Sequence, residues 1–102
     1  MKSLSFQKLL AELLGTFMLA TVVLVSLTPS TPFPLATPIA AALSLGLSVY
    51  LLGSVSGCHI NPAISLAMLV CRQMDIIHFV GYIIFQCAGA LLAYFFSAFL
   101  YP

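Results

Sequence analysis

Charge is what this sequence lacks most. Among 102 residues there are three Lys or Arg and two Asp or Glu, whereas a soluble domain carries about 25% charged residues. A net charge of +1 provides neither a basic face nor an acidic tail, so we expect no nucleic-acid partner. Hydrophobic residues make up 63% of the chain and its mean hydropathy is +1.21. We therefore predict an integral membrane protein whose surroundings are lipid.

The sequence also lacks the patterns of metal sites and enzymes. Its three cysteines have neither C-x-x-C nor metal-ligand spacing, and we expect Cys71 and Cys87 to be small core residues. One carboxylate inside an apolar stretch, two histidines and no pairing of a nucleophile with a base provide no means to run a reaction. We therefore predict no metal, no cofactor and no enzymatic activity.

Three apolar stretches are long enough to cross a membrane. A hydrocarbon core of about 30 Å requires about 20 helical residues. The stretches that meet this length lie at about residues 7–27, 38–56 and 76–101. Small residues four apart in the last stretch, Gly89, Ala93 and Ser97, favour close helix packing within lipid.

The first stretch carries features that a signal peptide would share. Lys2 and Lys8 precede an apolar run, as in a secretory signal. Glu12 lies inside that run and the remaining chain is equally apolar, so we expect a retained helix. Residues 28–38 contain four prolines, which predict a non-helical connection to the second stretch.

The segment NPAISLAMLVC, residues 61–71, is too short to cross the membrane. Asparagine is a favoured N-cap and proline a favoured first helical residue, so this segment predicts a helix start, although N-P also marks ordinary turns. About 10 residues at about 1.5 Å each cover only half a membrane. Non-helical backbone within a membrane must be buried in protein or line a water-filled cavity. We therefore interpret residues 57–71 as a re-entrant loop and half-helix.

Such a half-helix has electrostatic consequences for passing molecules. Its unpaired N–H groups and its dipole place partial positive charge at the N-terminal end, which orients polar molecules and disfavours cations. The loop before it must be non-helical, so its carbonyls can line a path as acceptors. The loop residues concerned are Gly57, Cys58, His59 and Ile60.

The stretch SGCHINPAISLAML, residues 56–69, resembles the SG-x-H-x-NPA-V-T-x-A signature of the aquaporins, or major intrinsic proteins. AELLGTF at 11–17 is similar to the first-helix motif A-E-x-x-G-T-F of that family, and IIFQCAGA at 83–90 to its third-helix A-Q-x-x-G-A region. The resemblance covers nearly all of the chain. It implies an all-α integral membrane fold, with three transmembrane helices and one re-entrant half-helix forming a single repeat over residues 1–102. It also implies a passive channel for water or small neutral solutes such as glycerol, in the cell membrane.

The resemblance also implies that a second half is needed. Family members have two inverted repeats whose NPA motifs meet at the membrane midplane, and this chain has one repeat. The simplest completion is an antiparallel pair of identical chains, and the family's four-pore assembly would then require eight copies. The positive-inside rule opposes this, because Lys2, Lys8 and Arg72 favour one orientation. A separately encoded half or a nonfunctional fragment is the alternative. A small proton-coupled exporter is less favoured, because it would need a carboxylate open to its substrate.

By the same resemblance, Asn61, Pro62 and Ala63 lie at the pore centre. Glu12 would be a buried brace that accepts hydrogen bonds from the pore-loop backbone, in preference to a proton relay, and Gln86 would assist it. We expect a packing and hydrogen-bonding role for His59 in preference to solute contact. We expect His78, near Asp75, to lie at the membrane interface.

Selectivity is where the sequence departs from the family. The family's constriction combines an arginine after the second NPA with an aromatic residue of the second helix. Here Ile64 follows the motif, Ala41 occupies the second-helix position, and Cys58 would face the constriction from the loop. A filter built from these residues of both chains is wide and apolar, which favours small neutral solutes such as glycerol over strict water selectivity. Proton exclusion would then depend on the half-helix dipoles alone.

Overall fold

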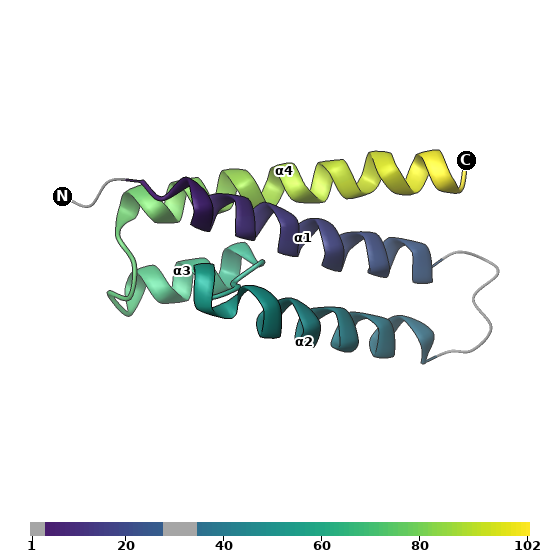
Figure 1. Ribbon diagram of the computed structural model, residues 1–102, viewed down its shortest axis with the longest axis horizontal. Coiled ribbons are helices and arrows are strands. Elements are labelled where there is room, and N and C mark those ends of the chain that lie inside the picture. Colours follow the sequence, from purple (N-terminus) through teal and green to yellow (C-terminus); the bar gives the residue numbers. More distant parts are fainter. Residues whose placement is uncertain (1–3, 28–34) are drawn as a thin grey trace.

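The computed structural model describes residues 4–27 and 35–102, so Lys2 and most of the proline-rich connection lie outside the described residues. The described chain is helical throughout, without strands (Figure 1). Its helices are α1 (Phe6–Ser26), α2 (Ala36–Ser56), α3 (Pro62–Val70) and α4 (Ile76–Leu100). Three of them, α1, α2 and α4, are long and apolar enough to cross a membrane. The predicted fold class, an all-α membrane protein with three spans and one short helix, is confirmed.

The long helices lie side by side with α1 in the middle (Figure 1). Helix α1 packs against both α2 and α4, and the short α3 packs against α4. Among the described helices, the backbone of α2 does not approach that of α3 or α4 closely, and a single hydrogen bond, from the Tyr82 hydroxyl to the Ser56 carbonyl, joins α2 to α4. Figure 1 shows α3 at the end of the bundle where α2 finishes and where α1 and α4 begin. The chain therefore returns through α3 to the end at which α2 finished.

Close approach of α1 and α4 depends on a glycine. A Cβ at Gly89 would lie 2.5 Å from the Leu13 carbonyl oxygen and 3.2 Å from the Phe17 nitrogen. Ala93, one turn later, is 0% exposed. In lipid there is no hydrophobic driving force between helices. The close approach of the two backbones therefore stabilises the α1–α4 pair through van der Waals contact.

Helices α1 and α4 begin with side-chain caps. Ser5 Oγ accepts from the Lys8 nitrogen at the start of α1, and Asp75 Oδ1 accepts from the His78 nitrogen at the start of α4. Helix α2 begins two residues before Pro38, which therefore lies in the first turn. Proline is tolerated there because first-turn N–H groups have no partner within the helix.

Helix α3 ends in a Schellman motif with an unusual residue. The Gln73 nitrogen donates to the Met68 oxygen at 2.8 Å, and the Arg72 nitrogen donates to the Leu69 oxygen at 3.0 Å. Arg72 occupies the left-handed position with φ 61°, where glycine is usual. This turn directs the chain from α3 to the start of α4.

The most deeply buried side chains are largely polar. The largest fully buried ones are Leu9, Gln86, Glu12, Ser48 and Ser65. Many large apolar side chains are exposed, as expected where lipid replaces water at the surface. Cys71 and Cys87 are exposed as well, so the prediction that both are core residues is wrong. A thiol behaves as a small hydrophobe and has little reason to be buried when the surroundings are apolar.

Candidate functional site

The loop between α2 and α3 has a strained backbone. Gly57 has φ 84°, Cys58 has φ 49° and Ile60 has φ 40°. Positive φ is uncommon outside glycine and is a true outlier for a β-branched residue such as isoleucine. Such residues persist only where surrounding contacts hold them, and they concentrate at functional sites.

Glu12 of α1 supplies those contacts. Its carboxylate is 0% exposed. Oε2 accepts from Ser56 Oγ at 2.7 Å and from the His59 nitrogen at 3.0 Å, while Oε1 accepts from the Ile60 nitrogen at 2.8 Å and from Gln86 Nε2 at 2.8 Å. A carboxylate has about four acceptor positions, so its capacity is filled by donors. This is the arrangement that a structural brace requires.

Three consecutive N–H groups of the loop point to one set of acceptors. The Cys58 nitrogen donates to Ser56 Oγ at 3.1 Å, next to the two N–H groups that Glu12 binds. Within the part of the chain that the structure describes, the carbonyls of Gly57, Cys58, His59 and Ile60 have no hydrogen-bond partner. These oxygens remain available as acceptors.

Asn61 ends the loop and caps α3. Its Oδ1 accepts from the Ala63 nitrogen at 2.8 Å, its backbone is extended, and Pro62 is the first helical residue. Both Asn61 and Pro62 are exposed. No described residue accepts a hydrogen bond from Asn61 Nδ2. The positive end of a half-membrane helix and a free amide donor therefore lie together on an open face.

A second group of contacts ties α3 to α4 through Ser65, which is 0% exposed. Gln86 Nε2 donates to Ser65 Oγ at 3.0 Å, and His59 Nδ1 lies 2.9 Å from the same oxygen. Gln86 Oε1 is buried and has no partner among the described residues. Ser65 was not among the predicted site residues, although it is the single polar residue of α3 and is distinctive for that reason.

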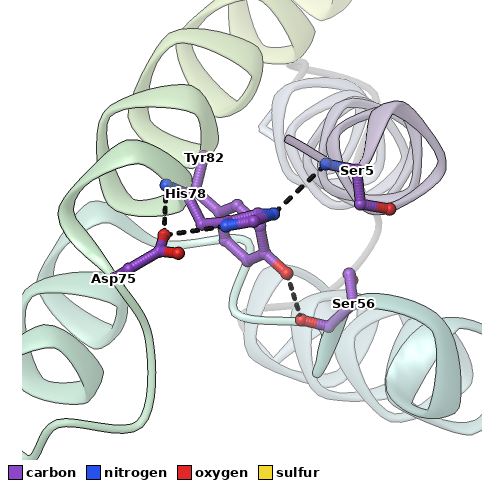
Figure 2. Close-up of polar contacts among 5 residues, drawn as sticks. All are labelled: Ser5, Ser56, Asp75, His78 and Tyr82. Carbon is purple, nitrogen blue, oxygen red and sulfur yellow. Dashed lines mark hydrogen bonds and ion pairs between the residues drawn. The ribbon is translucent and has the colours of Figure 1, made fainter. Parts of the chain in front are cut away.

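Tyr82 of α4 was also missed, and nothing in its apolar stretch marks it. Its hydroxyl donates to the Ser56 carbonyl at 2.6 Å, and its ring lies 4.9 Å from the His59 ring, centroid to centroid. Figure 2 shows Tyr82 reaching across to the end of α2. The Ser56 carbonyl belongs to the last turn of α2, where no helical partner exists, so the tyrosine satisfies it.

A polar cavity of about 370 Å³ lies at the same end of the molecule. Its lining includes Lys8, Ser56, Gly57, His59, His78 and Tyr82. His59 therefore both packs within the loop and borders a cavity. Among the described residues, no cluster of three or more His, Cys, Asp or Glu side chains could hold a metal ion.

The three residues expected to form the selectivity region differ in how exposed they are. Ile64 is 48% exposed, and Ala41 is half-buried on α2. Cys58 is 6% exposed, and its sulfur is 3.8 Å from where a Cβ at Gly15 would lie. The thiol therefore packs against α1 and does not reach an open face, which differs from the sequence expectation. The absence of a side chain at Gly15 makes room mainly for Ile60, whose Cγ2 would lie 2.6 Å from a Cβ at Gly15.

Comparison with known proteins gives a consistent picture. The family model described as major intrinsic protein (MIP) matches residues 1–102. Glycerol uptake facilitator protein-like 6 of Lactiplantibacillus plantarum is 41% identical over 87 residues, which are 85% of this chain and 40% of that protein. Aquaporin-5 of Sus scrofa is 38% identical over 96 residues, 87% of this chain and 35% of its own. Aquaporin-1 of Rattus norvegicus is 45% identical over 56 residues, 51% of this chain and 21% of its own. The chain thus spans less than half the length of these relatives.

Proposed function

This chain belongs to the major intrinsic protein family, and from that premise we propose that it forms half of a passive transmembrane channel for water and small neutral solutes such as glycerol. The observation that carries the proposal is the Glu12-held loop. Its N–H groups are turned inward, its carbonyls lack partners, and it ends at an exposed helix N-terminus. A row of acceptors followed by a donor suits uncharged solutes with hydroxyl groups.

We propose that a second copy in antiparallel orientation supplies the other half. By backbone proximity among the described helices, α2 packs closely only against α1 and α3 only against α4, so one side of each remains uncovered. Asn61 and Ile64 are exposed on α3 and can meet their counterparts there. Four such pores would contain eight copies. The plasma membrane is the location we propose for this integral membrane protein.

Other ways of completing the pore predict different behaviour. A half supplied by another polypeptide would leave this chain alone without permeability, as would a nonfunctional fragment. A proton-coupled transporter would need a carboxylate open to substrate, whereas Glu12 is 0% exposed and its acceptor positions are filled by protein donors. We propose neither an enzymatic role nor a cofactor for this chain.

For selectivity, we propose that Ile64 and Ala41 of both copies form the narrow region together with the Cys58 carbonyl. The Cys58 thiol has no part in it because it packs against Gly15. An apolar filter without arginine is expected to pass glycerol as well as water.

The experiment is stopped-flow light scattering of liposomes that contain only the purified chain, under water and glycerol gradients. Asn61→Asp keeps the oxygen that caps Ala63 but removes the free amide donor, so the helix start is retained. Loss of one hydrogen bond to the permeating molecule should lower permeability about two- to tenfold. Phe99→Leu, at an 81% exposed position near the end of α4, is the matched control and should change nothing. No permeability from protein with normal helix content would contradict the pairing of identical halves.

A further inference from the structure

His78, in the first turn of α4, uses both nitrogens of its ring. Nδ1 lies 2.8 Å from Asp75 Oδ1, and Nε2 lies 3.2 Å from the Ser5 backbone nitrogen. The residue is 8% exposed. Figure 2 shows the imidazole held between Asp75 on one side and Ser5 on the other.

The two partners determine where the imidazole proton lies. Asp75 offers a carboxylate oxygen, so Nδ1 carries the hydrogen and donates it. Ser5 offers an N–H, so Nε2 must accept, which only a neutral imidazole can do. In the protonated ring both nitrogens are donors, and Nε2–H would face the Ser5 N–H. Protonation and the contact with Ser5 therefore exclude each other.

Asp75 prevents the ring from flipping to relieve the clash between Nε2–H and the Ser5 N–H. The same Oδ1 accepts from the His78 backbone nitrogen at 2.8 Å as the N-cap of α4, so the carboxylate is fixed. A ring flip would break the hydrogen bond from Nδ1 to Asp75. That bond holds the protonated ring at least as strongly as the neutral one, because both partners are then charged. On protonation the contact with Asp75 becomes an ion pair and persists, whereas the contact with Ser5 is lost.

The contact with Ser5 joins two helix starts. Ser5 is the N-cap of α1 and Asp75 is the N-cap of α4. The geometry points to His78 as a proton-responsive tie: the neutral ring holds the start of α1 against the start of α4, and proton uptake releases it. This inference concerns control of the bundle end and does not depend on what the channel conducts.

Charged and titratable groups surround the tie. Asp75 on α4 contacts the ring directly. Lys8 of α1, His59 of the loop and Tyr82 of α4 line the same cavity as His78. A second positive charge in a cavity that Lys8 already borders is disfavoured, which adds to the release of α1 when His78 is protonated. Because that cavity also borders Ser56 and Gly57, the tie is placed where its release alters the entrance to the loop.

The test uses the full chain in lipid bilayers and follows hydrogen–deuterium exchange of the peptide that contains Ser5, divided by the intrinsic rate at each pH. Histidine changes charge between about pH 5 and pH 8. One proton excluded from the tied state lowers its equilibrium constant up to about tenfold per pH unit, so protection should fall about tenfold from pH 8 to pH 5.5. His78→Gln places an uncharged acceptor near the Nε2 position and should show no such fall. His78→Lys provides no acceptor and should be unprotected throughout.

Solid-state ¹⁵N NMR of the imidazole provides a readout without substitution. The signal of His78, assigned by its loss in His78→Gln, should show hydrogen on Nδ1 and an accepting Nε2 at neutral pH. Hydrogen on Nε2 of His78 at neutral pH would overturn the proposal. Exchange protection that is independent of pH in the wild type, or that falls equally in His78→Gln, would overturn it as well.

Discussion

Gln86 of α4 donates to Glu12 of α1 at 2.8 Å across 74 positions of sequence, and both side chains are almost completely buried. The pair connects the two helices that enclose the strained loop between α2 and α3. Because Glu12 also binds the N–H groups of His59 and Ile60, the loop conformation depends on a carboxylate that belongs to another helix.

Glu12→Gln should therefore destabilise the fold. The amide retains one acceptor oxygen and turns an NH₂ group toward donors, so buried N–H groups of the loop lose their partner. We expect a loss of about 2–4 kcal/mol in the free energy of unfolding, measured by SDS titration of protein in mixed micelles.

The exchange of both residues, Glu12→Gln with Gln86→Glu, provides the control. It retains an amide–carboxylate contact between the helices but leaves the loop N–H groups facing an amide. The double variant should remain as unstable as Glu12→Gln. Recovery of wild-type stability would show that the loop does not need the carboxylate at position 12.

Gly89 and Gly46 offer a matched pair of alanine substitutions. A Cβ at Gly89 would lie 2.5 Å from the Leu13 carbonyl oxygen, whereas a Cβ at Gly46 meets nothing within 4 Å. Gly89→Ala must push α1 and α4 apart and should cost about 1–3 kcal/mol. Gly46→Ala should be neutral or stabilise by up to about 1 kcal/mol, because alanine favours helix. Equal unfolding free energies for the two variants would contradict the close approach of α1 and α4.

Much of this arrangement could be predicted from residues that act locally. Asn61 and Pro62 mark the start of α3 because capping needs only neighbouring atoms. Glu12 could be recognised because a carboxylate in an apolar stretch requires partners. The roles of Ser65 and Tyr82 could not, since each depends on contacts between distant segments: Gln86 lies 21 positions from Ser65, and the Ser56 carbonyl lies 26 positions from Tyr82.

The loop backbone could not be predicted for a different reason. Residue preferences disfavour positive φ at Cys58 and above all at Ile60. The hydrogen bonds that these N–H groups donate, from Ile60 to Glu12 of α1 and from Cys58 to Ser56, stabilise that backbone. The Cys58 thiol is buried and lies 3.8 Å from where a Cβ at Gly15 would be. Sequence position alone suggested that the thiol faces the constriction.

Arg72 tests the turn after α3. Its φ of 61° suits glycine, which lacks a Cβ, so Arg72→Gly should stabilise the folded state by up to about 1 kcal/mol. Arg72→Val places a β-branched side chain in the same conformation and should destabilise by about 1–2 kcal/mol. Both variants remove the same charge, so their difference in SDS titration isolates the backbone. The opposite order of stability would mean that Arg72 does not adopt this conformation.

The pairing of copies can be tested by cross-linking, because antiparallel and parallel arrangements place the same residue differently. In a background of Cys58→Ala, Cys71→Ser and Cys87→Ser, Ile64→Cys should form a disulfide-linked dimer in bilayers, since Ile64 is half-exposed in the first turn of α3. The geometric reason is that two α3 N-termini near the membrane midplane meet whichever way each copy points.

Phe99→Cys in the same background is the discriminating control. Phe99 lies near the end of α4 and is 81% exposed, so in an antiparallel pair the two copies of this residue lie on opposite sides of the membrane. A disulfide requires Cα atoms within about 7 Å and cannot span a core of about 30 Å. Dimers through position 64 without dimers through position 99 therefore indicate antiparallel halves. Dimers through position 99 alone would indicate that the copies share one orientation, as the distribution of Lys8 and Arg72 favours, and that the second half of the pore comes from elsewhere.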